Sequence, residues 1–150
     1  MKLSDYLCES GIEMDFQGSS KSEIIRNLVV LLSKTTEIEN SEKIVEMLEE
    51  REQLKTTGIG SGIAIPHCKS LEVDKVHIVI GISKTGIDFE SLDNKPAHLF
   101  FLLVAPEKGG AEHLKASAKI VRLFRDEDFQ KQLLDLSSSL EVLKLIAENE

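Results

Sequence analysis

The sequence lacks a long apolar run, a dense set of cysteines and a signal segment. Its longest strongly apolar stretch, Leu99 to Ala105, is much shorter than the roughly 20 residues that a transmembrane helix needs. Its two cysteines, Cys8 and Cys68, do not form the framework of a small secreted domain, and residues 1–16 contain no apolar leader. We therefore expect a protein of the reducing cytoplasm that does not insert directly into a membrane.

The chain also lacks an excess of basic residues. It carries 18 lysines and arginines against 26 aspartates and glutamates, a formal net charge of -8. A surface of this sign repels a phosphate backbone, so nucleic acid is not expected as a partner. With 150 residues and 41% hydrophobic content the chain can bury a core without structural metals or disulfides, which predicts one domain over residues 1–150.

Capping residues and apolar spacing predict five helices. Ser20 and Glu23 form a capping-box pair ahead of apolar residues at helical spacing. A second helix is expected over residues 40–52, with Asn40 or Ser41 as its N-cap. Three more are expected at residues 112–124, 126–136 and 140–148.

The predicted strands lie among these helices. An extended piece is expected at residues 12–16, and strands are expected at residues 62–66, 76–83 and 97–106. The last of these is apolar on both faces, which is typical of a central strand covered by helices on both sides. The order of elements predicts an α/β or α+β fold with a mixed central β-sheet and helices on both faces.

A glycine-rich segment, TTGIGSGIAIPHC at residues 56–68, precedes one of these strands. Nucleotide-binding glycine loops follow a strand and begin a helix, because the phosphate binds at the N-terminus of that helix. Here the glycines follow a helix and no Gly-Lys-Ser/Thr sequence is present, so a nucleotide site is not predicted. One explanation is that the glycines let the backbone pass close to another element. The other keeps this role and adds exposed N–H groups that form an anion pocket with Thr57 and Ser61.

Two histidines are candidates for chemistry. Pro66 has no backbone N–H and should end the strand, so His67 is expected at a strand end. His113 is expected in the first turn of a helix, where free N–H groups and the positive end of the dipole favour a bound anion. The two imidazoles could flank a phosphoryl group if the fold brings them together, and otherwise His67 is a structural loop histidine.

Other chemistries find less support. His67, Cys68 and His113 lack the paired spacing of metal ligands, so no metal or cofactor is expected. Cys68 as a nucleophile would need a base and an orienting group, which adjacency to His67 does not supply. Ser61 does not lie in the G-x-S-x-G turn of hydrolases, and no base or water for hydrolysis can be identified.

Motifs along nearly the whole chain resemble one family. The segment TTGIGSGIAIPH, the arginine before it in EEREQL, the segment DNKPAHLFFLLVAP and the later EHL are similar, in this order, to the fructose/mannitol/nitrogen class of enzyme IIA. Members of this class are phosphoryl carriers of the bacterial sugar phosphotransferase system. The resemblance implies that His67 is the phosphorylated residue, that His113 stabilises the phosphoryl group and that Arg51 compensates phosphate oxygens.

The resemblance also carries weaker assignments and one departure. Ser61 matches a polar position six residues before the active histidine. Relatives commonly have glycine after the Pro-His pair, where this chain has Cys68, so a thiol open to oxidation is expected beside the imidazole. The glycines are expected to give a partner's phosphohistidine or cysteine close access to His67.

The resemblance implies HPr as phosphoryl donor and a IIB protein or domain as acceptor. The chain is expected to be either a separate subunit of a fructose-like transporter or a nitrogen-type regulator whose phosphorylation state is read by other proteins. The TTGIG loop and the IDFESLDNKP segment favour the regulator. The alternative from a different class is a docking module of the same fold that has lost carrier activity.

Overall fold

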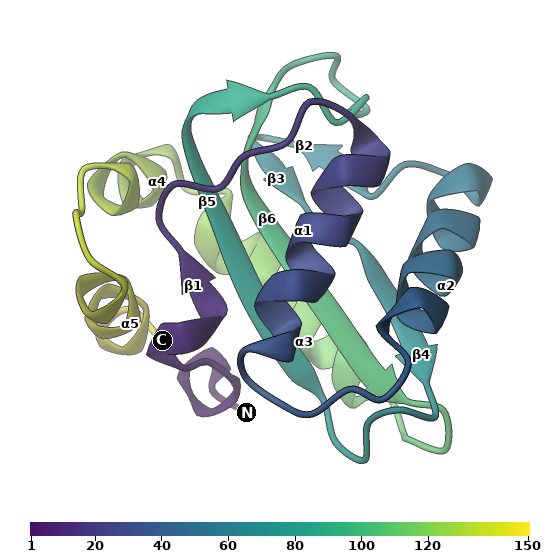
Figure 1. Ribbon diagram of the computed structural model, residues 1–150. Coiled ribbons are helices and arrows are strands. Elements are labelled where there is room, and N and C mark those ends of the chain that lie inside the picture. The colour runs from purple at the N-terminus through teal and green to yellow at the C-terminus, as the bar shows by residue number, and fades with distance from the viewer.

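A computed structural model describes the chain from Met1 to Glu150 (Figure 1). Its strands are β1 (Ile12–Glu13), β2 (Gly58–Gly60), β3 (Ile63–Ala64), β4 (His67–Ser70), β5 (His77–Ile87) and β6 (Ala97–Pro106). They form one mixed sheet in the order β1-β5-β6-β3-β2, and β4 pairs with β6 as well. Both β3 and β4 run parallel to β6, whereas β5 runs antiparallel to it.

The helices are α1 (Lys21–Ser33), α2 (Ser41–Leu54), α3 (Glu112–Phe124), α4 (Glu127–Leu134) and α5 (Ser139–Glu148). In Figure 1, α1 crosses in front of the sheet and α3 lies behind it, with α4 and α5 at the left. Apolar side chains of α1 and α2 share one core cluster, and those of α3, α4 and α5 share the other. The predicted mixed sheet with helices on both faces is confirmed.

The caps form as the sequence predicts. The Ser20 hydroxyl accepts a hydrogen bond from the Glu23 N–H at 3.2 Å, and the Asn40 side chain caps α2 through the Lys43 N–H. Two short 3₁₀ turns near the N-terminus, Leu3–Tyr6 and Glu9–Gly11, were not predicted. None of the helices has the length and apolar character needed to cross a membrane.

Strand β6 is the centre of the sheet. Its residues are buried on both faces except His98 and the last residue, Pro106. Phe101 packs in the cluster with α3, whereas the neighbouring Phe100 packs in the cluster with α1 and α2. This alternation explains why the strand is apolar along its whole length rather than at every second position.

Strand boundaries differ from the sequence prediction in two places. β5 continues to Ile87, because after a register shift Ile87 pairs with Ala97 of β6. β1 is only two residues long, although the Phe16 N–H still donates to the Ile82 carbonyl at 2.9 Å. Both differences depend on pairing with residues distant in the chain.

The prediction that the strand ends at Pro66 is only half correct. β3 ends at Ala64, but His67 begins a new strand, β4, rather than projecting from a strand end. Ile63 pairs with Leu99 and His67 pairs with Leu103, four residues later on both strands, so the register is unchanged. The Pro66 carbonyl accepts a hydrogen bond from the Leu103 N–H at 3.0 Å. This bond maintains the pairing with β6 although Pro66 has no N–H to donate.

Candidate functional site

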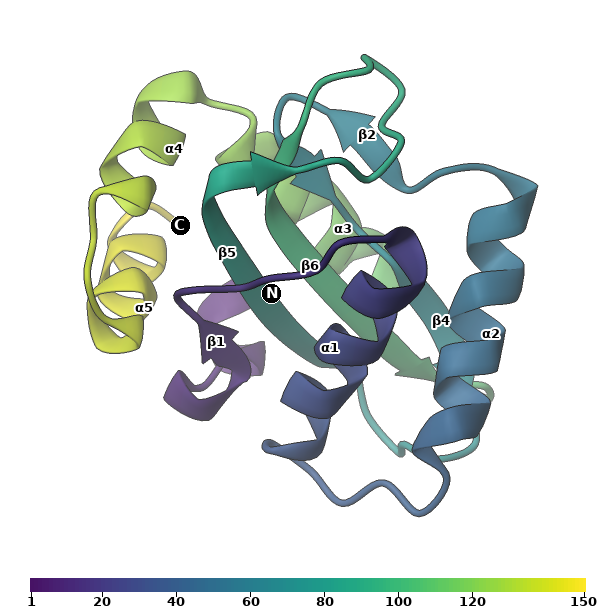
Figure 2. The ribbon, with the colours of Figure 1, turned by 45° about the horizontal axis from the view of Figure 1, so that its top comes forward.

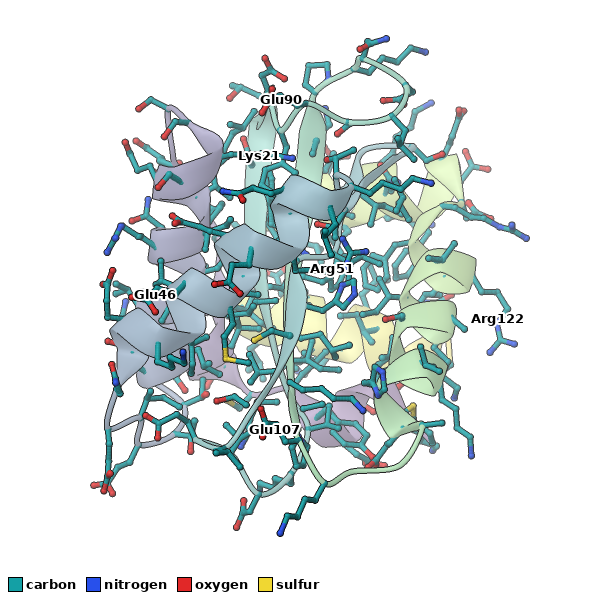
Figure 3. All side chains as sticks on the ribbon, turned by 90° about the vertical axis from the view of Figure 1, so that its right-hand side faces the viewer. Lys21, Glu46, Arg51, Glu90, Glu107 and Arg122 are labelled. Atoms are coloured by element: carbon teal, nitrogen blue, oxygen red, sulfur yellow. The ribbon has the colours of Figure 1, made fainter.

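A cavity of about 670 Å³ lies where α2, β4 and the start of α3 meet. Arg51, His67 and His113 all line it, so the structure brings together the three residues that the sequence singles out. Figure 3 shows Arg51 between α2 and α3, with Arg122 pointing away from the molecule beyond α3. The two histidines are 46 positions apart in the sequence but line the same cavity.

The orientation of His67 is fixed by its own backbone. Its Nδ1 lies 2.8 Å from the Ile65 carbonyl oxygen. A carbonyl only accepts hydrogen bonds, so Nδ1 carries a proton, and in the neutral ring the free lone pair is on Nε2. The side chain is half-buried and lines the cavity. Nε2 of the neutral ring is thus an unprotonated nitrogen without a protein partner.

His113 enters the cavity from the first turn of α3. Ala111, the N-cap, supplies no side-chain hydrogen bond, so the positive end of this helix is uncapped. The Nδ1 atom of His113 is buried without a hydrogen-bond partner in the protein. The Tyr6 hydroxyl donates to the Glu112 carboxylate and so ties the start of α3 to the N-terminal turn.

Arg51 provides a cation that is free to bind an anion. Its Nη1 donates to the Lys55 carbonyl at 2.9 Å, and it forms no ion pair. The other charged residues of the cavity are Glu50, Lys69 and Glu107. A guanidinium without a carboxylate partner, together with two imidazoles, is a suitable environment for a phosphoryl group.

Cys68 lines the same cavity but packs against the α1–α2 core. Burial raises the pKa of its thiol to about 12. This shift disfavours the thiolate, which is the reactive form, and so does not support the expectation of an oxidisable thiol beside the imidazole. No group of three His, Cys, Asp or Glu side chains is placed to hold a metal ion.

The glycine-rich turn lies away from this cavity. Strand β2 and its turn pack against the loop that follows β5, and a Cβ on Gly58 would lie 3.0 Å from the Ser91 Cα. The expectation that these glycines give a partner access to His67 is wrong. Gly58 serves instead the close backbone approach that the sequence analysis gave as the other explanation, and Gly60 and Gly62 adopt positive φ values.

Thr57 and Ser61 are also outside the cavity. The Thr57 hydroxyl donates to the buried carboxylate of Glu52. Ser61 donates through its N–H to Asp93 at 3.1 Å, and its carbonyl accepts from Gln130 at 2.6 Å. The structure therefore does not bring either residue together with His67.

Sequence reasoning missed several residues that line the cavity. Lys69 lies two positions after His67 on β4, and strand alternation places them on the same face. That signal was lost because the strand was expected to end before His67. Glu107 follows the end of β6, and Met47, Leu54 and Leu103 supply apolar lining.

Comparisons with known proteins show the family of the chain. The profile of the family described as phosphoenolpyruvate-dependent sugar phosphotransferase system, EIIA 2, matches residues 5–149. A nitrogen regulatory protein of Bradyrhizobium diazoefficiens is 39% identical over 133 residues, covering 89% of this chain and 86% of that protein. The fructose-specific EIIABC component of Bacillus subtilis is 35% identical over 150 residues, and this chain spans only 24% of its length.

Solved structures show the same fold. The nitrogen regulatory protein IIA-Ntr from Neisseria meningitidis matches with a TM-score of 0.87 and 28% identity, over 96% of this chain and 98% of that one. Enzyme IIAMTL, solved in complex with phosphorylated enzyme IIBMTL from Escherichia coli, matches with a TM-score of 0.79 and 25% identity, over 95% and 97%. The chain therefore belongs to the EIIA family of the phosphoenolpyruvate-dependent sugar phosphotransferase system.

Proposed function

We propose that this chain, over residues 1–150, is a phosphoryl carrier that accepts phosphate from phospho-HPr on Nε2 of His67. It then passes the phosphoryl group to a IIB partner or acts as a signal through its phosphorylation state. One observation carries the proposal: the hydrogen bond from Nδ1 to the Ile65 carbonyl selects the tautomer of the neutral ring whose Nε2 is free, in a cavity shared with Arg51 and His113.

The transfer step needs no proton movement on His67. The Nε2 lone pair attacks phosphorus in line, and the bond from phosphorus to the donor nitrogen breaks with its electron pair left on that nitrogen. Throughout, Nδ1 keeps its proton and donates a hydrogen bond to the Ile65 carbonyl, 2.8 Å away. This hydrogen bond also stabilises the positive charge that the ring gains when Nε2 is bonded to phosphorus.

Arg51 and His113 act on the oxygens of the group in transfer. The guanidinium of Arg51 offers several donors and a fixed positive charge to the phosphoryl oxygens. His113 offers its imidazole next to the uncapped N-terminus of α3, where anions are favoured. Fixed donors of this kind stabilise the transition state without binding a sugar, as a carrier requires.

Relatives of both functional kinds support the two outcomes of the phosphorylated state. One matched protein is named a nitrogen regulatory protein, and another is named a fructose-specific component. The matched complex of IIAMTL with phosphorylated IIBMTL supports a IIB protein as the acceptor. Phosphate passing from this chain to a sugar-specific IIB would indicate transport, and its absence would indicate regulation.

The test is incubation with phosphoenolpyruvate, enzyme I and HPr, followed by mass spectrometry. We expect one acid-labile, base-stable phosphate adduct on the wild type and none on His67→Gln. A matched control is His98→Gln, because the Nδ1 of His98 also bonds to a backbone carbonyl, that of Ser83 at 2.9 Å, but His98 does not line the cavity. The control should take up phosphate like the wild type.

Two results would contradict the proposal. Phosphate uptake by His67→Gln would place the acceptor elsewhere. No uptake by the folded wild type would favour the alternative of a docking module that has lost carrier activity.

A further inference from the structure

We propose that the buried ion pair of Glu52 and Lys21 positions the imidazole of His67 by way of Thr57 and Ile65. The proposal deepens the function proposed above and rests on it for its kinetic consequence. Glu52 and Lys21 do not line the cavity of His67, so neither is a catalytic residue. They act as positioning residues, through backbone hydrogen bonds.

The carboxylate of Glu52 is buried and its hydrogen-bonding capacity is fully used. The residue is only 7% exposed. Both carboxylate oxygens lie 3.1 Å from the Thr57 nitrogen, and the Thr57 hydroxyl donates to one of them. The ammonium of Lys21 lies 2.7 Å from the other oxygen. Charge-assisted hydrogen bonds of this kind are strong, so Thr57 is held firmly.

Lys21 is fixed in turn by three groups. Besides Glu52, its Nζ donates to the Thr56 hydroxyl at 3.0 Å and lies 4.8 Å from the centre of the Phe89 ring. In Figure 3, Lys21 lies nearer the top of the view and Arg51 nearer its centre. The ion pair therefore fastens the start of α1 to the end of α2, immediately before the chain enters β2.

Two further hydrogen bonds connect Thr57 to the imidazole. The Thr57 carbonyl accepts from the Ile65 N–H at 3.0 Å. The Ile65 carbonyl accepts from Nδ1–H of His67 at 2.8 Å. A displacement of the Thr57 backbone thus displaces the acceptor that sets the tautomer of His67.

Pro66 makes this connection important. Residues 65 and 66 lie between β3 and β4, outside either strand. Pro66 cannot donate, so the backbone here is held by the Ile65 bond to Thr57 and by the Pro66 carbonyl bond to Leu103. If the hydrogen bond from Ile65 to Thr57 is lost, only the bond between the Pro66 carbonyl and Leu103 still holds this backbone.

A second ion pair between the same two helices provides a matched control. Arg26 of α1 and Glu42 of α2 form two hydrogen bonds of 2.9 Å, but both side chains are more than half exposed. No hydrogen bond connects this pair to the residues that hold His67. If clamping α1 to α2 were the only role of Glu52, neither substitution would change the tautomer of His67.

The test compares Glu52→Gln with Glu42→Gln in the full chain. The ring nitrogens of His67 are observed by ¹⁵N NMR, and phosphoryl uptake is followed against HPr concentration. For Glu52→Gln we expect the Nε2–H tautomer of His67 to appear and the maximal uptake rate to fall about tenfold, with the half-saturating HPr concentration unchanged. Glu42→Gln should match the wild type in all three measurements.

Glu52→Gln leaves the Lys21 charge without its partner and could fail to fold. The double variant Lys21→Met/Glu52→Gln removes both charges, and the same shift of tautomer is expected in it. A single Nδ1–H tautomer and a wild-type rate in either folded variant would overturn the proposal. The NMR measurement needs no phosphate, so it decides the positioning role even if the wild type takes up none and the proposed function fails.

Discussion

The two ends of the segment from Thr57 to Ser70 have opposite roles in the structure. At one end, β2 and its turn carry three glycines and pack backbone against the loop after β5. At the other end, β4 carries His67, Cys68 and Lys69, whose side chains line a cavity. Figure 2 shows β2 at the top of the molecule and β4 at the opposite end of the sheet.

This difference separates the requirements of folding from those of chemistry. At Gly58 another backbone lies where a side chain would be, and Gly60 and Gly62 have positive φ values of 96° and 78°, which favour glycine. The residues of β4 are needed for the groups that they present. Substitutions at the glycine end should therefore lower stability and leave phosphoryl transfer intact. Substitutions around the cavity should slow phosphoryl transfer and leave stability nearly unchanged.

The largest effect is expected for Arg51→Ala, on the cavity side of the comparison. Removing the unpaired guanidinium should lower the rate of phosphoryl uptake by about 10²–10³-fold, since a charged donor to the transferring group is lost. The unfolding free energy should change by less than about 1 kcal/mol, because the side chain is only partly buried and has one hydrogen bond, to Lys55. Uptake kinetics test the expected loss of rate, and urea unfolding tests the expected unfolding free energy.

Arg51→Lys is the informative companion variant. It keeps the charge but loses the planar set of donors, so an intermediate rate is expected. A rate for Arg51→Ala within a few-fold of the wild type would show that the guanidinium does not act on the phosphoryl group.

The next effect is expected for Gly58→Ala, at the glycine end. The added Cβ would meet the Oγ and Cα of Ser91, so the loop must shift and the unfolding free energy should fall by about 1–3 kcal/mol. Phosphoryl uptake per folded molecule should stay at the wild-type rate, because the loop that holds Ser91 moves while Thr57 keeps its hydrogen bonds to Glu52 and Ile65. Gly110→Ala is the control, because its Cβ would have nothing within 4 Å. A large loss of uptake in folded Gly58→Ala would break the comparison.

A smaller effect is expected from Cys68 at high pH. Its pKa is raised by burial from 9.0 to about 12, so between these values the unfolded chain loses the thiol proton while the folded chain keeps it. Stability should then fall as pH rises through this window, by up to about 1.4 kcal/mol per pH unit from this group. Urea unfolding at several pH values should show a shallower decline in Cys68→Ala than in the wild type.

Cys8→Ala is the control for that measurement. Cys8 is exposed, so its removal should leave the decline unchanged. An identical pH dependence for the wild type and Cys68→Ala would mean that the thiol is not desolvated in the folded protein.

The sequence was sufficient for features that depend on neighbouring residues. Ser20 and Asn40 mark helix starts through local caps, and the apolar run of β6 marks a strand buried on both faces. The three cavity residues Arg51, His67 and His113 followed from the family resemblance and from local chemistry. Their convergence in one cavity depends on β4, α2 and α3 meeting, which no local pattern contains.

Other features could not be predicted, because they depend on residues brought together by the fold. Glu52 belongs to the same acidic helix as Glu46, Glu49 and Glu50, and nothing local distinguishes it from them. It is buried only because Lys21 and Thr57 arrive beside it in the folded chain. Likewise, the unchanged register across Pro66 is set by the partner strand, not by the proline.

The smallest effect is expected for Ser61→Gly, which tests the boundary between the two ends. Ser61 has a positive φ of 56°, and its side chain makes no hydrogen bond within the protein. Glycine relieves the strain of this conformation but gains freedom in the unfolded chain, so stability should change by less than about 1 kcal/mol. The rate of phosphoryl uptake should equal that of the wild type. A several-fold loss of uptake, with Asp93→Asn unaffected as a control for the turn, would show that the serine reaches the phosphoryl group during transfer.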